Sequence, residues 1–180
     1  MLEKERAVVE KWDAYGPRRE KLGYELLRGQ ILPRGVRHLV AHMLYYNGKG
    51  QVLLQRRSES RPLAPGLWAL TGGSALAGET SWQACIRESR EEMGIVPAWE
   101  QSEIPLSYMT PDAHVDVYLI FWNGNLHQLH LQREEVAQAA WLNREEFLRL
   151  SADQKHFWQY PYLPLLTQYL DQRPGVWENS

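Results

Sequence analysis

Three glutamates stand at helical spacing near the middle of the chain. Glu88, Glu91 and Glu92 occupy positions i, i+3 and i+4, so in a helix their side chains would converge within roughly 5–6 Å on one face. Like charges at that distance repel one another, and a divalent cation would relieve the repulsion. Carboxylate oxygens suit Mg²⁺ or Mn²⁺ in an open site that recruits substrate phosphate. On acid spacing alone, a solvated helix face is the alternative interpretation.

A glycine-rich segment comes directly before these acids. It contains Gly72, Gly73 and Gly78, and it ends at Glu79. A glycine-rich turn at the start of a helix lets backbone groups approach an ion or a phosphate closely. The glycine pair also predicts the end of a short strand that begins at Trp68. The segment therefore favours phosphate chemistry over a merely solvated acidic face.

The spacing of these residues resembles the Nudix box, Gx5Ex7REUxEExGU, in which U is a bulky apolar residue. The match runs from Gly73 through Glu79 to residues 87–95 and fixes seven positions over 23 residues. That spacing is far more specific than a lone glycine motif. Ser89 departs from the pattern, because it occupies the first U position. We expect its hydroxyl to bond the carbonyl of Cys85.

The resemblance implies an α/β fold, a Nudix-type α/β/α sandwich with a mixed β-sheet. It also implies hydrolysis of the P–O–P bond of a nucleoside diphosphate linked to another moiety, or of a similar small diphosphate, with Mg²⁺ or Mn²⁺ as cofactor. Such an ion would neutralise phosphate charge and activate a bound water. Arg87 would belong to the same catalytic group and pair with Glu79. The implied metal ligands are three carboxylates and one carbonyl, those of Glu88, Glu91, Glu92 and Gly72.

Two arginines end a predicted strand near the expected cleft. Arg56 and Arg57 could clamp a phosphate bidentately, together with Gly73 and Glu79 of the loop. The alternative is a pair of surface arginines with no ligand.

A weaker resemblance to the branch of the superfamily that contains isopentenyl-diphosphate isomerase extends over nearly the whole chain. It is carried by four stretches, residues 37–39, 50–57, 65–68 and 134–142. The isomerase reaction needs a cysteine and a Gly-His-Pro run beside the loop, and residues 69–74 contain neither. Hydrolysis is therefore the predicted reaction. An isomerase-type enzyme and a non-catalytic Nudix-fold ligand sensor are the alternatives.

Further titratable residues lie outside the box. His38, His114 and Asp116 resemble positions that hold metal or acid–base groups in the isomerases, so they form a candidate second site. His114 and Asp116 would share one strand face, although a hydrogen-bonded histidine beside a solvated aspartate fits equally. Glu134 and Glu135 precede a predicted strand, where a loop can supply a general base or merely carry solvated charge.

The hydrophobic pattern predicts the elements that must position these residues. The clearest helix covers residues 81–93, between a cap at Thr80 or Ser81 and Gly94. Strands are expected at residues 11–15, 23–27, 38–46, 51–57, 105–109 and 114–122. A segment from residue 134 to 141 leads into a helix at 143–150, and a last helix covers 163–170. Four aromatic residues are expected to pack under the C-terminal helices: Phe157, Trp158, Tyr160 and Tyr162.

Composition limits the possible partners. The 180 residues are 44% hydrophobic and carry 20 Lys and Arg against 22 Asp and Glu, which favours a single domain over residues 1–180. The net charge of -2 predicts no binding of a nucleic-acid polymer or a membrane surface. The lone Cys85 and the lack of a long apolar stretch predict a cytoplasmic protein. Residues 1–34 should form an N-terminal hairpin or arm, which could pair across a homodimer.

Overall fold

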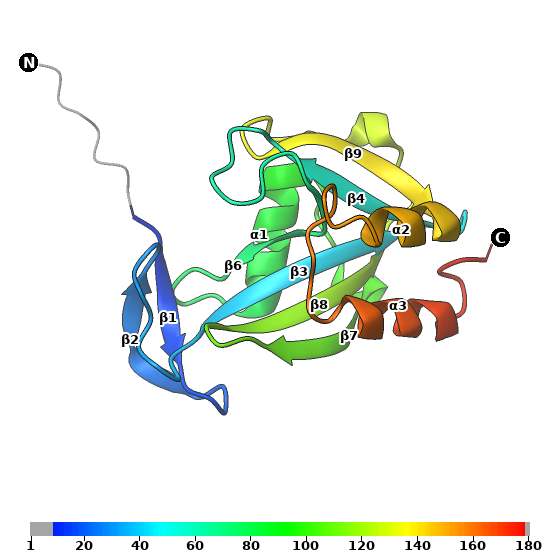
Figure 1. Cartoon of the computed structure of the whole chain (residues 1–180). Coiled ribbons are helices and arrows are strands. Elements are labelled where there is room, and N and C mark those ends of the chain that lie inside the picture. The colour runs from blue at the N-terminus through cyan, green and yellow to red at the C-terminus, as the bar shows by residue number, and fades with distance from the viewer. Residues whose placement is uncertain (1–8, 179–180) are drawn as a thin grey trace, which may run out of the picture.

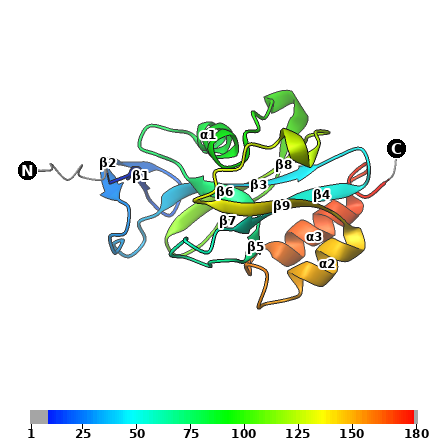
Figure 2. The ribbon, with the colours of Figure 1, turned by 90° about the horizontal axis from the view of Figure 1, so that it is seen from above.

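The computed structural model describes residues 9–178 as a mixed sheet with helices on both faces. Figure 2 shows helix α1 (Ser81–Met93) on one face, and α2 (Arg144–Ser151) and α3 (Leu163–Gln172) on the other. The predicted α/β/α sandwich is therefore confirmed. None of the helices between residues 9 and 178 has the length and apolar character needed to cross a membrane.

The main sheet contains seven strands. Five form a continuous path in the order β5 (Trp68–Ala69), β4 (Gln51–Arg57), β3 (His38–Tyr46), β8 (Ala113–Phe121) and β7 (Ser102–Met109). In addition, β6 (Thr71–Ser74) pairs with β3, and β9 (Val136–Asn143) pairs with β4. The β3–β8 pair is parallel and the β3–β6 and β4–β9 pairs are antiparallel, so the sheet is mixed as predicted.

The hairpin strands β3 and β4 separate soon after their turn. Their register contains only Tyr45 opposite Leu53 and Tyr46 opposite Val52. Beyond these residues β3 continues along β6, whereas β4 continues along β9 and β5. The divergence of the two strands creates room between β6 and the end of β4.

Helix α1 has the bounds that its local signals predict. Thr80 accepts a hydrogen bond from the Gln83 amide at 3.2 Å, and the Gln83 side chain accepts one from the Thr80 amide at 2.8 Å. This capping box satisfies amides at the start of the helix. Gly94 ends the helix in the left-handed conformation, with φ 73°, which a glycine adopts without steric cost.

The glycine pair lies inside β6, so the prediction that it ends a strand was wrong. Gly72 pairs with His42, and Gly73 pairs with Ala41. A Cβ atom on Gly72 would lie 2.5 Å from the Ala41 carbonyl oxygen, and one on Gly73 would lie 2.2 Å from Oε1 of Glu88. The missing side chains therefore allow β6 to fit between β3 and the acidic side chains of α1.

Ser89 lies on the packed face of α1, but its hydrogen-bond partner differs from the expected one. The Tyr45 hydroxyl donates a hydrogen bond to Ser89 Oγ, and both side chains are fully buried. The expected bond to the Cys85 carbonyl is thus replaced by a contact with the sheet below. A buried phenol needs a partner, which explains why a serine can occupy a position that the box gives to an apolar residue.

The two-stranded hairpin of β1 (Lys11–Tyr15) and β2 (Lys21–Leu27) lies beside the main sheet, next to the loop that precedes α1. Its backbone joins that loop where the Ala77 amide donates to the Lys11 carbonyl at 2.8 Å. The Gly78 amide donates to Asp13 at 2.9 Å. The hairpin belongs to the predicted N-terminal arm, whose first eight residues lie outside the described residues.

Asp116 on β8 attaches this hairpin to the main sheet. Both carboxylate oxygens accept hydrogen bonds from Arg19, which follows β1, and Nη1 of Arg19 lies 2.8 Å from Oδ1. Ser81 at the start of α1 and Ser107 on β7 also donate to Asp116, which is only 3% exposed. Asp116 therefore joins three separate elements.

The two histidines of the candidate second site also contact the hairpin region. His114 Nε2 lies 2.8 Å from the Gly16 carbonyl oxygen, and the His38 ring stacks on Trp12 with centroids 4.1 Å apart. Together with the Arg19 contacts of Asp116, these interactions give all three side chains partners within the fold, and a second metal or acid–base site stays a prediction. In the part of the chain that the structure describes, the three residues form no metal cluster.

Replacement of Ser89 by alanine should leave the buried Tyr45 hydroxyl without an acceptor. We expect Ser89→Ala to lower the free energy of unfolding by about 1–3 kcal/mol, measured by urea denaturation. The double variant Ser89→Ala with Tyr45→Phe removes both polar groups and should recover most of the loss. Equal stability of wild type and Ser89→Ala would contradict the contact.

Replacement of Asp116 by asparagine should weaken the attachment of the hairpin in a pH-dependent manner. Burial would raise the pKa of Asp116, but hydrogen bonds from Arg19, Ser81 and Ser107 outweigh burial and lower it. A carboxyl with a lowered folded-state pKa stabilises the fold above its unfolded pKa, and this stabilisation is lost as the pH falls through the folded pKa. Asp116→Asn should therefore cost about 1–3 kcal/mol at neutral pH.

The cost should shrink below about pH 4, where the carboxyl of the unfolded wild-type chain begins to be protonated while the folded one is still ionised. Urea denaturation at pH 7 and pH 3 measures the difference in the free energy of unfolding between wild type and Asp116→Asn. Asp171 forms an exposed pair with Arg144 at 2.7 Å, so Asp171→Asn is a matched control that should cost less than about 1 kcal/mol. A pH-independent difference between wild type and Asp116→Asn would contradict the assignment.

Candidate active site

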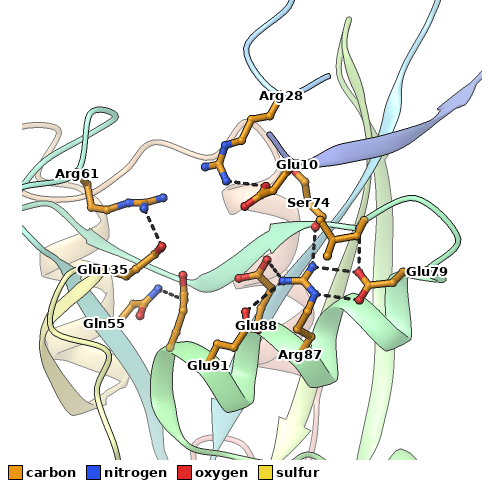
Figure 3. Close-up of polar contacts among 12 residues, drawn as sticks. Glu10, Arg28, Gln55, Arg61, Ser74, Glu79, Arg87, Glu88, Glu91 and Glu135 are labelled. Atoms are coloured by element: carbon orange, nitrogen blue, oxygen red, sulfur yellow. Dashed lines mark hydrogen bonds and ion pairs between the residues drawn. The ribbon is translucent and has the colours of Figure 1, made fainter. Parts of the chain in front are cut away.

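A cleft of about 510 Å³ lies between α1, β6, the end of β4 and the loop before β9. This volume is typical of small-molecule sites, which span roughly 300–1,000 Å³. Charged side chains line it, as Figure 3 shows for most of them. The acidic residues are Glu10, Glu88, Glu91, Glu92 and Glu135, and the cationic residues are Arg28, Arg57, Arg61 and Arg87.

Arg87 lies at the centre of the acidic side of the cleft. Its Nε and Nη2 donate to the two carboxylate oxygens of Glu79 at 2.9 and 3.0 Å, and Nη2 also donates to the Ser74 carbonyl at 2.9 Å. Nη1 donates to Glu88 at 2.7 Å and to Glu91 at 3.3 Å. A guanidinium has five N–H donors, and these contacts account for all of them. Arg87 therefore ties β6, the loop and α1 together (Figure 3).

Glu92 is the most deeply buried acid of the cleft, with 3% of its surface exposed. Gln55 Nε2 on β4 donates to Glu92 Oε2 at 2.8 Å. Burial raises the pKa of Glu92 to about 8, and the charge of nearby Glu88 adds to the effect. The carboxyl at this position therefore favours a bound proton or a nearby cation.

The other two acids of the predicted set lie in the same cleft but are oriented differently. Glu88 is mostly buried, and burial raises its pKa although Arg87 opposes that rise. Glu91 is more exposed, with 54% of its side chain accessible. Glu88 and Glu91 contact Arg87, and Glu92 contacts Gln55. In this arrangement no three acidic, histidine or cysteine side chains within residues 9–178 converge as the ligands of one ion.

The donor set nevertheless fits a hard divalent cation. Every candidate ligand is an oxygen atom, which suits Mg²⁺ or Mn²⁺ rather than zinc. The buried Gln55 Oε1 beside Glu92 has no hydrogen-bond partner among the described residues, and Gly72 and Gly73 line the same cleft. Binding would require Glu88 and Glu91 to turn from Arg87 toward Glu92.

Only one of the two predicted phosphate-clamp arginines lies in the cleft. Arg57 lines it, and its guanidinium lies 5.1 Å from the ring centroid of Trp158. Arg56 instead bonds the Gly66 carbonyl and the Glu59 carboxylate, both at 2.9 Å. Neighbouring residues of a strand point to opposite faces, so Arg56 lies outside the cleft and Arg57 is the better candidate for binding phosphate.

Arg57 and Arg61 form the cationic side of the cleft. Burial and then the neighbouring Arg61 lower the pKa of Arg57. No carboxylate lies within ion-pair distance of Arg57 among the ion pairs of residues 9–178. Arg61 pairs with Glu135 at 2.8 Å. Glu135, one of the two acids predicted as general-base candidates on the loop before β9, therefore lies at the cleft. Glu134 does not line the cleft.

The sequence analysis did not identify several of the residues that line or border the cleft. Gln55 could have been found, because it lies two residues before Arg57 and therefore on the same strand face. Trp158 belonged to an aromatic cluster assigned to packing, and the rest of that cluster is buried as expected. Nothing in the local sequence indicates that Glu10 and Arg28 of the hairpin region reach the cleft.

Comparisons with known proteins support both the family and the fold. The sequence profile described as NUDIX domain matches residues 36–166. An uncharacterized Nudix hydrolase of Listeria monocytogenes is 40% identical over 139 residues, which cover 77% of this chain and 82% of that protein. The crystal structure of DR0079 from Deinococcus radiodurans aligns with a TM-score of 0.71 and 24% identity, over 88% of this chain and 98% of that one.

A further structural neighbour is the NUDIX domain of Shewanella oneidensis NrtR, which was solved in complex with ADP ribose. It aligns with a TM-score of 0.56 and 19% identity, over 76% of this chain and 88% of that chain. At this identity the likeness concerns the fold.

Replacement of Glu92 by glutamine should stabilise the metal-free protein at alkaline pH. The folded-state pKa of about 8 lies above the ordinary 4.5, so the wild-type free energy of unfolding should fall as the pH rises between these values. Glu92→Gln should abolish this fall and be more stable at pH 8 by on the order of a few kcal/mol.

Urea denaturation in excess chelator from pH 4.5 to 8.5 measures the effect. Glu91→Gln, on the same helix face at an exposed position, is the matched control and should keep the wild-type pH slope. Identical slopes in wild type and Glu92→Gln would contradict the raised pKa.

Proposed function

The chain belongs to the NUDIX family and is a hydrolase of that family, and on this premise we propose that it requires Mg²⁺ or Mn²⁺ to cleave the P–O–P bond of a nucleoside diphosphate linked to another moiety, or of a similar small diphosphate. The observation that supports this proposal is the division of charge in the cleft. Buried carboxylates on α1 face a side that carries Arg57 and Arg61. A diphosphate bound through a cation suits such a divided surface.

Glu88, Glu91 and Glu92 would hold the cation, together with the Gly72 carbonyl. When bound, a divalent cation neutralises charge on the bridging phosphates and lowers the pKa of a coordinated water. The protein's own contribution is mainly to place the reacting groups. Arg57 would bind phosphate oxygens while Trp158 orients its guanidinium.

Arg87 and Glu79 would be positioning residues rather than substrate contacts. The N–H groups of Arg87 are used within the protein, and Glu79 bonds Arg87 and the Leu76 amide. Glu135 lines the cleft on the loop before β9. Of Glu134 and Glu135, it is the better candidate for the general base, provided that a substrate phosphate replaces it as the ion-pair partner of Arg61.

The isomerase alternative is disfavoured by the position of the cysteine. Cys85 lies on the packed face of α1 and is fully buried, and burial raises the pKa of its thiol to about 12. A residue so placed cannot exchange protons with a substrate in the cleft. The unpaired thiol also supports our proposal of a cytoplasmic location. A homodimer stays a prediction.

A panel of nucleotide sugars, dinucleotides, ADP-ribose, coenzyme A and prenyl diphosphates tests the proposed reaction. Each compound is incubated with the protein and Mg²⁺, Mn²⁺ or chelator, and the products are identified by mass. We expect hydrolysis of a diphosphate linkage only with metal, and more at mildly alkaline than at mildly acidic pH, because protons compete with the cation for the carboxylates.

Glu88→Gln and Glu92→Gln should each lower kcat by about 100-fold or more, because a metal contributes several kcal/mol to charge stabilisation. Glu103→Gln removes an exposed pair with Arg173 outside the cleft and should leave kcat unchanged. Full turnover in excess chelator, wild-type turnover of a folded Glu92→Gln protein, or metal-dependent isomerisation of a prenyl diphosphate would each contradict the proposal. Tight binding without turnover would identify a sensor.

A further inference from the structure

One side of the cleft is built by the N-terminal segment, which lies outside the family match at residues 36–166. Glu10, just before β1, and Arg28, just after β2, both line the cleft. Nη1 of Arg28 donates to Glu10 Oε2 at 2.7 Å. Figure 3 shows this pair across the cleft from the acidic side chains of α1.

The pair is not needed to close the hairpin. The Arg28 amide already donates to the Glu10 carbonyl at 3.0 Å, which fixes that end of the hairpin through the backbone. Exposed ion pairs contribute little to the free energy of unfolding, and both side chains here are about half exposed. A second cross-strand pair, Lys11 with Glu25 at 2.6 Å, has similar exposure but does not line the cleft.

The hairpin holds Arg28 at a fixed place over the cleft. Arg19 and Gly16 at its turn contact Asp116 and His114 of the main sheet. At the opposite end, the Ala77 amide bonds the Lys11 carbonyl. Because both ends are attached, Arg28 is presented by a supported element, as a ligand-binding side chain needs to be.

Arg28 is the cation on this side of the cleft, and its ion-pair partner is partly exposed. Arg87 is occupied by the protein, and Arg57 and Arg61 belong to the side that bears Glu135. Arg28 has a single, exposed carboxylate partner, which an incoming anion can replace at little cost. A guanidinium binds carboxylate and phosphate groups bidentately.

We propose that Arg28 binds an anionic group on the substrate moiety that lies beyond the scissile P–O–P bond, and that Glu10 occupies Arg28 when this group is absent. The preferred substrate class is then a nucleoside diphosphate derivative that carries an additional phosphomonoester or carboxylate. This inference rests on the proposed function, since it names the substrate class of the same site.

Substrate pairs that differ by one anionic group test the inference. Coenzyme A and dephospho-coenzyme A differ by a phosphomonoester, whereas UDP-glucuronate and UDP-glucose differ by a carboxylate. For each compound kcat and KM are measured with Mg²⁺, and the dissociation constant is measured by calorimetry with the whole 180-residue chain, both with Mg²⁺ and in chelator. The two pairs distinguish a phosphate-binding from a carboxylate-binding role.

The wild type should favour the charged member of at least one pair. Arg28→Ala should raise KM and Kd for that member by about 10-fold, the size of one charge-assisted contact, with kcat much less affected, and should thereby remove the preference. Glu10→Gln should lower Kd for the charged member by about 3-fold, because Arg28 loses its competitor. Lys11→Ala, which breaks the matched pair, should behave as wild type.

Opposite effects of Arg28→Ala and Glu10→Gln on Kd indicate that Arg28 binds the ligand. If the ion pair only stabilised the hairpin, both substitutions would weaken binding alike. A wild type without preference in either pair, or a preference that survives Arg28→Ala, overturns the inference. Binding of the charged member through Arg28 without hydrolysis of any compound would contradict the proposed function and support this inference. Absence of both binding and hydrolysis overturns both.

Discussion

The acidic face of α1 depends on one guanidinium that is shared among three carboxylates. Arg87 contacts Glu79, Glu88 and Glu91, while the carboxyl of Glu92 accepts its side-chain hydrogen bond from the neutral Gln55. One guanidinium among four carboxyl groups leaves a local excess of acidic groups in a partly buried place. Such an excess raises carboxyl pKa values and attracts cations. The same arrangement that opposes folding of the metal-free chain thus prepares the site for a divalent ion.

The backbone around this group follows from the need to fit charges closely together. Gly73 leaves space that Glu88 fills, and the Ser74 carbonyl, one residue later, accepts from Arg87. The divergence of β3 and β4 then leaves the cleft open on the side of Arg57. The opposed acidic and cationic sides give the cleft a polarity that a small metal-bound diphosphate complements, although the chain has little net charge.

Local signals determined what could be predicted from the sequence. Helix α1 has its predicted bounds, because its capping box and its left-handed glycine lie next to it, and β3 and β4 have theirs because a turn separates two periodic segments. The path of β6 through the glycine pair was missed, since glycine generally weakens strands and only the packed neighbours show why it is required. Likewise, which of two adjacent arginines enters the cleft depends on the sheet register.

The least predictable feature is the link between the hairpin and the acidic helix. Arg19 and Asp116 lie 97 positions apart in the chain, so no local pattern could pair them, and Asp116 resembled a site residue instead. The same carboxylate accepts a hydrogen bond from Ser81, the first residue of α1. One buried aspartate therefore supports both the helix that carries Glu88 and Glu92 and the hairpin that carries Arg28. Through this shared support, a segment outside the family match is positioned relative to the acids across the cleft.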